Sequence, residues 1–153
     1  DIERMNQQLA ERTDYDSEDY QKQLLQLDQR LTKLAAQAPQ KLFVTTHAAF
    51  GHLAADYGLQ QVAIMGISPD AEPTPADLKK LIDTIKEKQV KYVFFETLVS
   101  PRIAQTVAEA SGAQTLVLDP LEGLSEAGRK NGDDYLKIMT RNIDNLELAL
   151  GVK

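Results

Sequence analysis

Three side chains of the types that bind metal ions each follow a short strand-like segment of the chain: His47, Glu96 and Asp119. The carboxyl ends of parallel strands meet at one edge of an open α/β sheet, and ligands bind at that edge. Imidazole and carboxylate groups together suit zinc and similar divalent ions. If the strands are parallel and adjacent, we expect these three side chains to line one edge of the sheet.

Short apolar runs alternate with helical patterns, and these elements must position the three side chains. The runs contain few polar residues, which is typical of a parallel sheet that helices cover on both faces. The predicted strands are 42–46, 62–65, 92–95 and 115–118. The predicted helices are 48–56, 74–88, 100–110 and a last one that begins at Asp133 or Asp134, after a loop over 120–132. The sequence therefore predicts a three-layer α/β fold with a four-stranded parallel sheet.

Capping residues predict where several helices begin and end. Thr74 is followed by Pro75 and then by Asp77, which is the pattern of an N-cap, a first-turn proline and a first-turn acid. Gly58 is typical of the residue that follows a helix. Thr46 stands where it could cap the helix that follows the first strand.

A long one-sided helix precedes the sheet. Its apolar residues are spaced 4, 3, 4, 3 and 4 residues apart, and Pro39 ends the pattern. They are Tyr20, Leu24, Leu27, Leu31, Leu34 and Ala38. This stripe predicts a helix that covers a core; a coiled-coil seam is the alternative, but the stripe is short for one. We expect two parts, an amino-terminal segment with the long helix (1–39) and an α/β lobe (40–153).

Composition excludes several classes of protein. The chain has 153 residues, about one domain, and a formal net charge of −6, which argues against nucleic-acid binding. It contains no cysteine, so disulfides and thiolate metal sites are excluded. It also contains no apolar run long enough to span a membrane. Because it begins at Asp1 without an initiator methionine, we expect it to be part of a longer protein.

No set of residues predicts covalent catalysis or nucleotide binding. A convincing Ser-His-Asp order is missing, and the glycines after the fourth strand are too widely spaced for a phosphate-binding loop. A metal-dependent hydrolase remains an alternative, with Glu96 as its only candidate base. A flavodoxin-like or receiver-type binding domain explains less, because it accounts neither for the long helix nor for the absence of an acidic pair on the first strand.

Four segments carry a resemblance to a known family. They are, in order, KLFVTTHAAFGHLAADYGL, GISPDAEPTPADL, YVFFETLVSP and LVLDPL. Together they resemble the carboxy-terminal lobe of zinc- and manganese-binding solute-binding proteins of ABC transporters, the cluster A-I or adhesin-type lipoproteins of the bacterial cell surface or periplasm. The resemblance covers about residues 16–151.

The resemblance implies a function and a ligand set. In that family two lobes are joined by a long rigid helix, and each lobe supplies two ligands to a metal ion between them. His47 matches the third ligand and Asp119 the fourth, whereas Glu96 matches an acidic position near the site that is not usually a direct ligand. His52 stands where the family often has tyrosine, so we expect a partly buried polar residue and not a ligand.

The same resemblance implies partners and a location. The expected cargo is Zn²⁺, with Mn²⁺ as the alternative, and the expected partner is an ABC permease in the membrane. The protein is expected to be extracytoplasmic and to bind without catalysing a reaction. The first lobe and its two ligands have no counterpart in this chain, so an apolar face of the long helix could favour self-association.

Overall fold

The computed structural model describes residues 18–46, 48–64, 74–96, 101–121, 126–132 and 134–152. His47 lies outside the described residues, as do residues 1–17 and the predicted helix-start residues Ser100 and Asp133. The described elements are α2 (Glu18–Gln37), β1 (Leu42–Thr45), α3 (Gly51–Tyr57), β2 (Gln60–Ala63), α4 (Pro75–Glu87), β3 (Tyr92–Phe95), α5 (Arg102–Ser111), β4 (Gln114–Val117), α6 (Glu126–Lys130) and α7 (Tyr135–Ala149).

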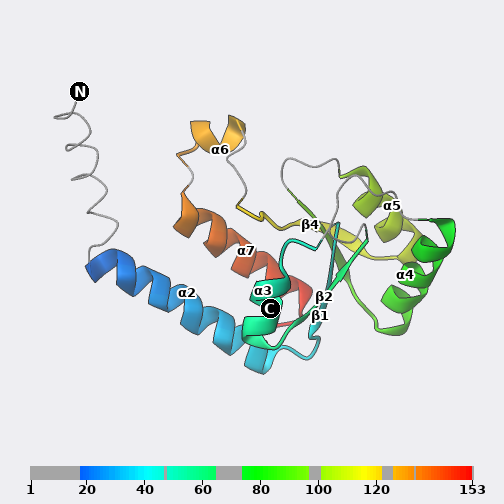
Figure 1. Ribbon diagram of the computed structural model, residues 1–153, viewed down its shortest axis with the longest axis horizontal. Coiled ribbons are helices and arrows are strands. Elements are labelled where there is room, and N and C mark those ends of the chain that lie inside the picture. The colour runs from blue at the N-terminus through cyan, green and yellow to red at the C-terminus, as the bar shows by residue number, and fades with distance from the viewer. Residues whose placement is uncertain are drawn as a thin grey trace.

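The four described strands form one parallel sheet in the order β2-β1-β3-β4, which confirms the predicted fold class (Figure 1). Helices α2, α3 and α7 cover one face and helices α4 and α5 cover the other. Each β-α-β unit therefore brings the chain back to the end of the sheet where the strands begin. The carboxyl ends of all four strands lie together at the opposite end of the strands.

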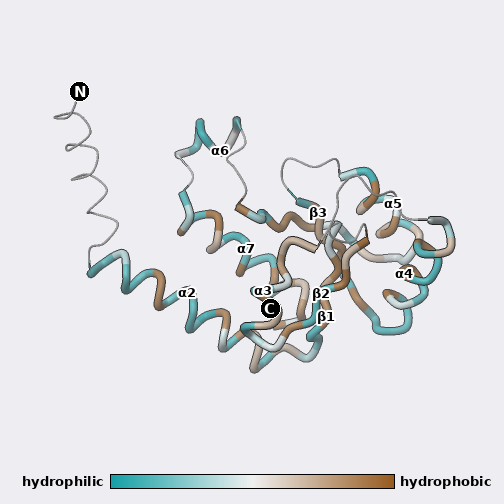
Figure 2. Tube along the Cα trace, viewed as in Figure 1, coloured by the Kyte–Doolittle hydropathy of each residue, from teal (hydrophilic) through white to brown (hydrophobic). Residues whose placement is uncertain are grey.

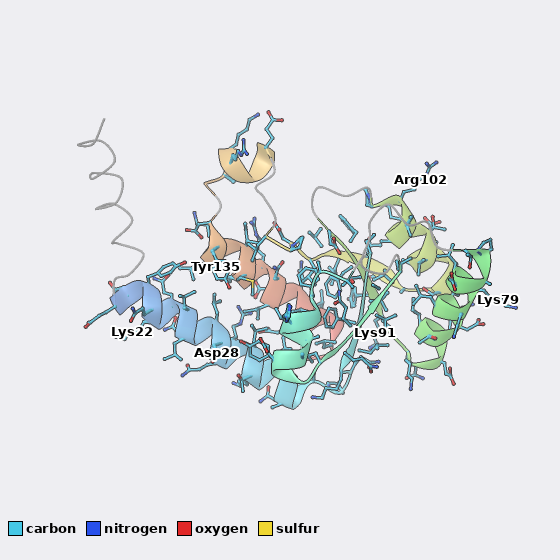
Figure 3. The ribbon with its side chains drawn as sticks, in the orientation of Figure 1. Lys22, Asp28, Lys79, Lys91, Arg102 and Tyr135 are labelled. Atoms are coloured by element: carbon cyan, nitrogen blue, oxygen red, sulfur yellow. The ribbon has the colours of Figure 1, made fainter. Side chains whose placement is uncertain are left out.

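Two apolar cores lie on the two faces of the sheet. Brown stretches of the tube in Figure 2 mark the hydrophobic residues. Phe43 and Phe94 face α2, α3 and α7, and their rings meet edge to face with centroids 6.3 Å apart. Val44 and Val93 face α4 and α5 on the other side. Lys22, Lys79 and Arg102 project from the outer faces of their helices (Figure 3). No described helix combines the length and apolar character that crossing a bilayer requires.

The long helix α2 packs against α7 and α3, mainly through its carboxyl half. Leu31 and Leu34 are 3% and 2% exposed, whereas Tyr20, Leu24 and Leu27 are only partly buried. The predicted stripe is therefore correct, but its burial increases along the helix. The carboxyl half of α2 contributes to the same core as α3 and α7.

The two edge strands begin earlier than the sequence predicts. β2 begins at Gln60 and ends at Ala63, and β4 begins at Gln114 and ends at Val117. Each begins with an exposed glutamine that joins the sheet through its backbone N–H, which donates to Lys41 and Lys91 respectively. Because such a residue pairs through its backbone and leaves its side chain in water, a search for apolar runs misses it.

Three helix predictions need correction. Helix α3 begins at Gly51 after Phe50, and Thr46 does not cap it; the Thr46 hydroxyl instead donates to the carbonyl of Phe94 at 3.4 Å. The predicted loop 120–132 contains α6, a helix of five residues that is too short for an apolar periodicity. Helix α5 begins at Arg102, two residues later than predicted.

Other local predictions are confirmed. Thr74 and Asp77 form a reciprocal capping box at the start of α4, and Pro75 occupies its first turn. Asp134 caps α7 by accepting a hydrogen bond from the backbone N–H of Lys137 at 2.9 Å. Gly58 adopts a left-handed conformation, with φ of 71°, after α3.

Candidate metal-binding site

The carboxyl ends of β1, β3 and β4 lie next to one another at one edge of the sheet. In the parallel register Thr45 pairs with Phe94, and Phe94 pairs with Leu116. Glu96 follows β3 directly, and Asp119 lies two residues after the end of β4. His47 follows β1 in the chain but lies outside the described residues, so its approach to Asp119 stays a prediction.

Asp119 stands where the chain leaves the sheet and turns. The backbone N–H of Leu118 donates to the carbonyl of Phe95 at 3.0 Å, so the pairing with β3 extends one residue past β4. One residue later, Oδ1 of Asp119 accepts a hydrogen bond of 2.8 Å from the backbone N–H of Leu121. Leu121 has a φ of 63°, a conformation that leucine rarely adopts. A carboxylate has about four lone-pair sites, so this turn leaves Asp119 able to bind a cation.

A buried asparagine of α7 holds the backbone of Asp119 on both sides. Oδ1 of Asn142 accepts from the N–H of Asp119 at 2.9 Å, and its Nδ2 donates to the carbonyl of Asp119 at 2.8 Å. We call this pair of bonds the amide bridge. Three residues along the same helix, Nδ2 of Asn145 donates to the carbonyl of Val117 at 2.7 Å.

Gln61 of β2 bonds to a residue on each side of His47 in the sequence. Nε2 of Gln61 donates to Oγ1 of Thr45 at 2.7 Å, and its Oε1 accepts from the N–H of Phe50 at 3.2 Å. Thr46, next to His47, is 1% exposed and bonds to β3 as described above. These contacts anchor the residues before and after His47 to the two neighbouring strands.

Glu96 is a fully buried carboxyl group, with 0% of its surface exposed. Groups of this kind are almost never fully buried unless other groups satisfy them. Glu96 is buried at the end of β3, between the strand ends that precede His47 and Asp119. This position fits a carboxylate that orients the predicted ligands better than a carboxylate that binds the metal at the open end of the strands. That role stays a prediction.

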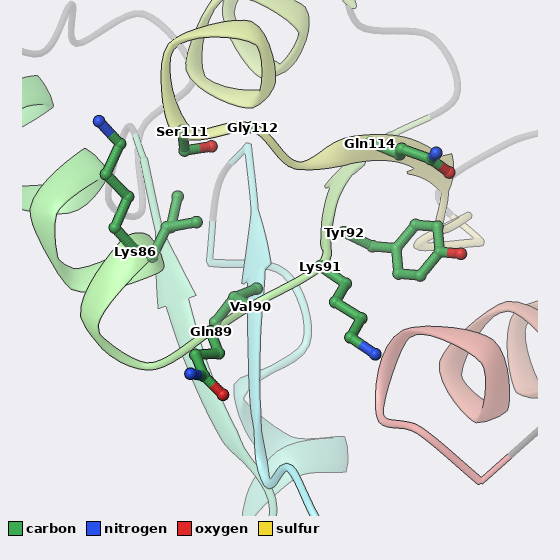
Figure 4. A pocket seen from close by; sticks show the side chains of 9 residues that line it. Lys86, Gln89, Val90, Lys91, Tyr92, Ser111, Gly112 and Gln114 are labelled. Atoms are coloured by element: carbon green, nitrogen blue, oxygen red, sulfur yellow. The ribbon is translucent and has the colours of Figure 1, made fainter.

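The described residues do not contain a complete metal shell. No group of three or more histidine, aspartate or glutamate side chains gathers within the described ranges. A surface hollow of about 520 Å³ lies elsewhere, at the amino-terminal ends of β3 and β4, and Lys86, Lys91 and Gln114 line it (Figure 4). Because it lies at the opposite edge of the sheet, it is separate from the predicted site.

Comparison with known proteins places the chain in a family. Residues 2–149 match the family model described as "Zinc-uptake complex component A periplasmic". The chain belongs to this family. The resemblance to metal-binding solute-binding proteins of ABC importers, predicted from four segments of sequence, is therefore confirmed.

Relatives of this zinc-uptake family span several bacteria. The chain is 43% identical over 133 residues to the zinc-binding protein AdcA of Streptococcus pyogenes serotype M6, covering 87% of the chain and 26% of the relative. It is 45% identical over 137 residues to the high-affinity zinc uptake system protein ZnuA of Bacillus subtilis, covering 90% of the chain and 43% of the relative. The chain thus spans less than half the length of these curated relatives.

Solved structures agree with the fold. The laminin-binding protein Lmb of Streptococcus agalactiae, described as bifunctional with adhesin and metal-transporting activity, has a TM-score of 0.76 and 38% identity over 86% of the chain and 50% of that protein. The Zn(II)-bound ZnuA-like domain of Streptococcus pneumoniae AdcA has a TM-score of 0.71 and 43% identity over 86% of the chain and 49% of that domain. The chain therefore matches about half of each structure.

In this zinc-uptake fold, one site prediction is corrected and two residues are added. His52 lies in the first turn of α3 with an exposed side chain, not a partly buried one, because the following Leu53 and Ala54 take the positions that face the core. The second change is an addition, since Asn142 and Gln61 were not predicted. Asn142 lies within the apolar face of α7, and its polarity there was the only signal that the sequence offered.

Proposed function

We propose that this chain is part of an extracytoplasmic solute-binding protein that captures a divalent transition metal for an ABC importer. Zinc is the proposed cargo, because the relatives are described as a zinc-binding protein and a zinc uptake system protein. Manganese is the alternative. The observation that carries the proposal is the meeting of β1, β3 and β4 at one edge of the sheet in a chain of this family. The partner that receives the metal is a permease in the membrane.

The proposed ligands are His47 and Asp119. A neutral imidazole and an ionised carboxylate form a mixed nitrogen and oxygen donor set, which suits zinc. Tetrahedral zinc takes about four ligands, so a second lobe would supply the remaining ones. We assign Glu96 a supporting role, because carboxylates behind the ligands commonly orient them.

The proposed mechanism is binding without turnover. Both ligands must be deprotonated, so zinc affinity falls as the pH drops through the range where histidine takes up a proton. A hydrolase would need a third protein ligand and a base that reaches a metal-bound water. Glu96 is the only candidate base, and its complete burial argues against that use.

The test is a zinc titration of the protein as its gene encodes it, with a competing chelator, at neutral pH. His47→Ala and Asp119→Asn should each weaken binding strongly, since each removes a ligand. His52→Ala is the matched control for the first, because His52 is an exposed histidine five residues away. Wild-type affinity in the His47→Ala variant would overturn the proposal.

A second control separates two carboxylates that are close in the sequence. Glu122 follows Asp119 by three residues in the sequence, so Glu122→Gln removes a carboxylate from the same segment without touching the proposed ligand. We expect Asp119→Asn to weaken zinc binding far more than Glu122→Gln. The reverse order would show that Asp119 serves the turn at Leu121 and that its assignment as a ligand is wrong.

A further inference from the structure

We propose that polar contacts at both ends of the buried stretch of α2 lock the long helix to the α/β lobe, so that helix and lobe move as one rigid body. The contacts involved lie outside the proposed metal site, so the assignment of its ligands does not enter. What they fix is the direction in which the amino half of α2 projects from the lobe.

Apolar packing alone leaves the direction of α2 open. The helix buries residues from Leu31 to Ala38 in the core that it shares with α3 and α7, whereas Tyr20 and Leu24 are only partly buried. The attraction between apolar surfaces has no preferred direction. A helix that rests on a lobe through one apolar patch can therefore tilt or roll on it, and hydrogen bonds must supply the direction.

The first set of contacts lies at the amino-terminal end of the buried stretch. The hydroxyl of Tyr57 on α3 donates to Oδ1 of Asp28 at 2.6 Å, and Nε of Arg30 donates to Oε1 of Glu147 on α7 at 2.9 Å. The Arg30 guanidinium also pairs with Asp144 on α7. We call these contacts the clamp. Residues two apart in a helix point about 200° apart, so α3 and α7 hold α2 from two sides.

The second set lies where α2 meets β1, and Gln40 is its centre. The backbone N–H of Gln40 donates to the carbonyl of Leu150 at 3.4 Å, at the end of α7. Its Nε2 donates to the carbonyl of Lys88 at 2.8 Å, at the end of α4. Because α7 and α4 cover opposite faces of the sheet, this joint is bonded to both layers of helices.

A glycine lets the end of the chain close on the same joint. Gly151 has a φ of 82°, and a Cβ atom there would lie 3.1 Å from Cγ of Pro39. Any side chain at this position would press on Pro39 and would also strain the backbone. The close approach of Gly151 to Pro39 thus holds the turn after α7 against the turn after α2.

Two separated sets of contacts fix a direction that one set would not. Arg30 of the clamp and Gln40 of the joint are about 15 Å apart along the helix axis, so α2 can neither pivot at the joint nor roll under the clamp. Any movement between the lobe and the residues that precede α2 must then occur before Asp28. If a second lobe completes the metal site, as proposed above, closure around the metal does not bend residues 28–40.

The experiment measures the distance between two spin labels in the full chain by pulsed electron paramagnetic resonance. The chain contains no cysteine, so Lys22→Cys and Lys79→Cys provide the only attachment sites. Both lysines are exposed, and they lie at opposite ends of the molecule (Figure 3). Lys22 lies about 27 Å from Gln40 along the helix, so a tilt of ~20° at the joint would move it by ~9 Å.

We expect one narrow distance distribution in the otherwise unchanged chain. Arg30→Ala combined with Tyr57→Phe removes the clamp and should broaden the distribution by several ångströms, and Gly151→Val should broaden it through the joint. Arg30→Ala alone serves if the double variant does not fold. Lys130→Ala is the matched control, because Lys130 pairs only within α6 as far as the described contacts show, and it should leave the distribution unchanged.

Two outcomes would overturn the inference. One is a broad distribution in the otherwise unchanged chain, which would mean that α2 already tilts on the lobe. The other is a distribution that stays narrow in a folded variant without the clamp, which would mean that apolar packing alone sets the direction. Neither measurement uses zinc, so the proposed function stands or fails separately, by the titrations described above.

Discussion

The hydroxyl group of Tyr57 on α3 donates a hydrogen bond of 2.6 Å to Oδ1 of Asp28 on α2. This bond joins the long helix to the helix that directly follows the segment of His47. Burial, and next the bond to Asp28, raise the pKa of Tyr57 from 10.0 to about 12. Helices α2 and α3 are therefore connected through a group whose charge state can be tested.

The first prediction concerns this bond at high pH. The folded pKa of Tyr57 lies above its unfolded value, so its contribution to stability is complete below pH 10.0 and is lost as the pH rises towards about 12. Tyr57→Phe should be less stable than the wild type at neutral pH, and the difference should shrink across that range. Urea unfolding of both proteins from ~pH 8 to ~pH 12 measures the difference in their free energies of unfolding. The difference should be largest and constant near ~pH 8. A constant difference would contradict the prediction.

The second prediction concerns an ion pair between α2 and α7. Nε of Arg30 donates to Oε1 of Glu147 at 2.9 Å, and its guanidinium also pairs with Asp144. The Glu147 side chain is 7% exposed and Arg30 is 30% exposed, so the pair is only partly shielded from water. Arg30→Ala should lower the free energy of unfolding by about 1–3 kcal/mol, since it leaves a buried carboxylate without its cation.

Its control is the pair of Glu126 and Lys130 on α6, which are 3.6 Å apart and are both largely exposed. Lys130→Ala should leave the free energy of unfolding almost unchanged, because exposed pairs contribute little. Chemical denaturation of the three proteins gives the comparison. If Arg30→Ala unfolded at the same denaturant concentration as Lys130→Ala, the pairing of α2 with α7 would add nothing to stability.

Part of this fold could be predicted from sequence for a simple physical reason. Apolar runs such as the one at Val44 are required wherever a strand is buried on both faces, so the central strands and their order along the chain are visible without a structure. Edge strands need fewer apolar residues, so Gln60 and Gln114 concealed where two strands begin. The five residues of α6 carry no periodic signal at all.

The candidate site, too, could be predicted from sequence only in part. The place of Asp119 after a strand could be predicted because residue type and strand end are local properties of the sequence; its role as a ligand stays a prediction. The amide bridge could not be predicted, because Asn142 is 23 residues from Asp119 and only the packing of α7 along β4 joins them. Gln61 was hidden for the same reason: its contacts cross from one strand to the next.

The third prediction concerns Gln61. Gln61→Leu removes both of its bonds, to Thr45 before His47 and to Phe50 after it. We expect zinc affinity to fall by about tenfold or more, because the segment of a proposed ligand loses its anchor. Gln60→Leu is the control, since Gln60 is exposed in the same strand. Chelator competition measures both variants, and equal affinity in the two would show that Gln61 serves only the sheet.

The last prediction follows from counting ligands. The chain spans about half of the two solved structures described above, and its proposed ligands are His47 and Asp119. Tight zinc sites take about four ligands in a tetrahedral shell, so water would fill the remaining positions in this chain alone. The missing ligands would also no longer be held in place around the ion, which removes part of the advantage of a preorganised site.

We therefore expect this chain to bind zinc orders of magnitude more weakly than a form extended to the length of its relatives. Isothermal titration of both forms with zinc at neutral pH gives the comparison, and His47→Ala in the longer form shows whether the same site is measured. In the longer form the substitution should cause a large loss, because it removes one of four ligands; in the chain alone the loss should be smaller in absolute terms. Equal affinity of the two forms would show that the metal does not bind between two lobes.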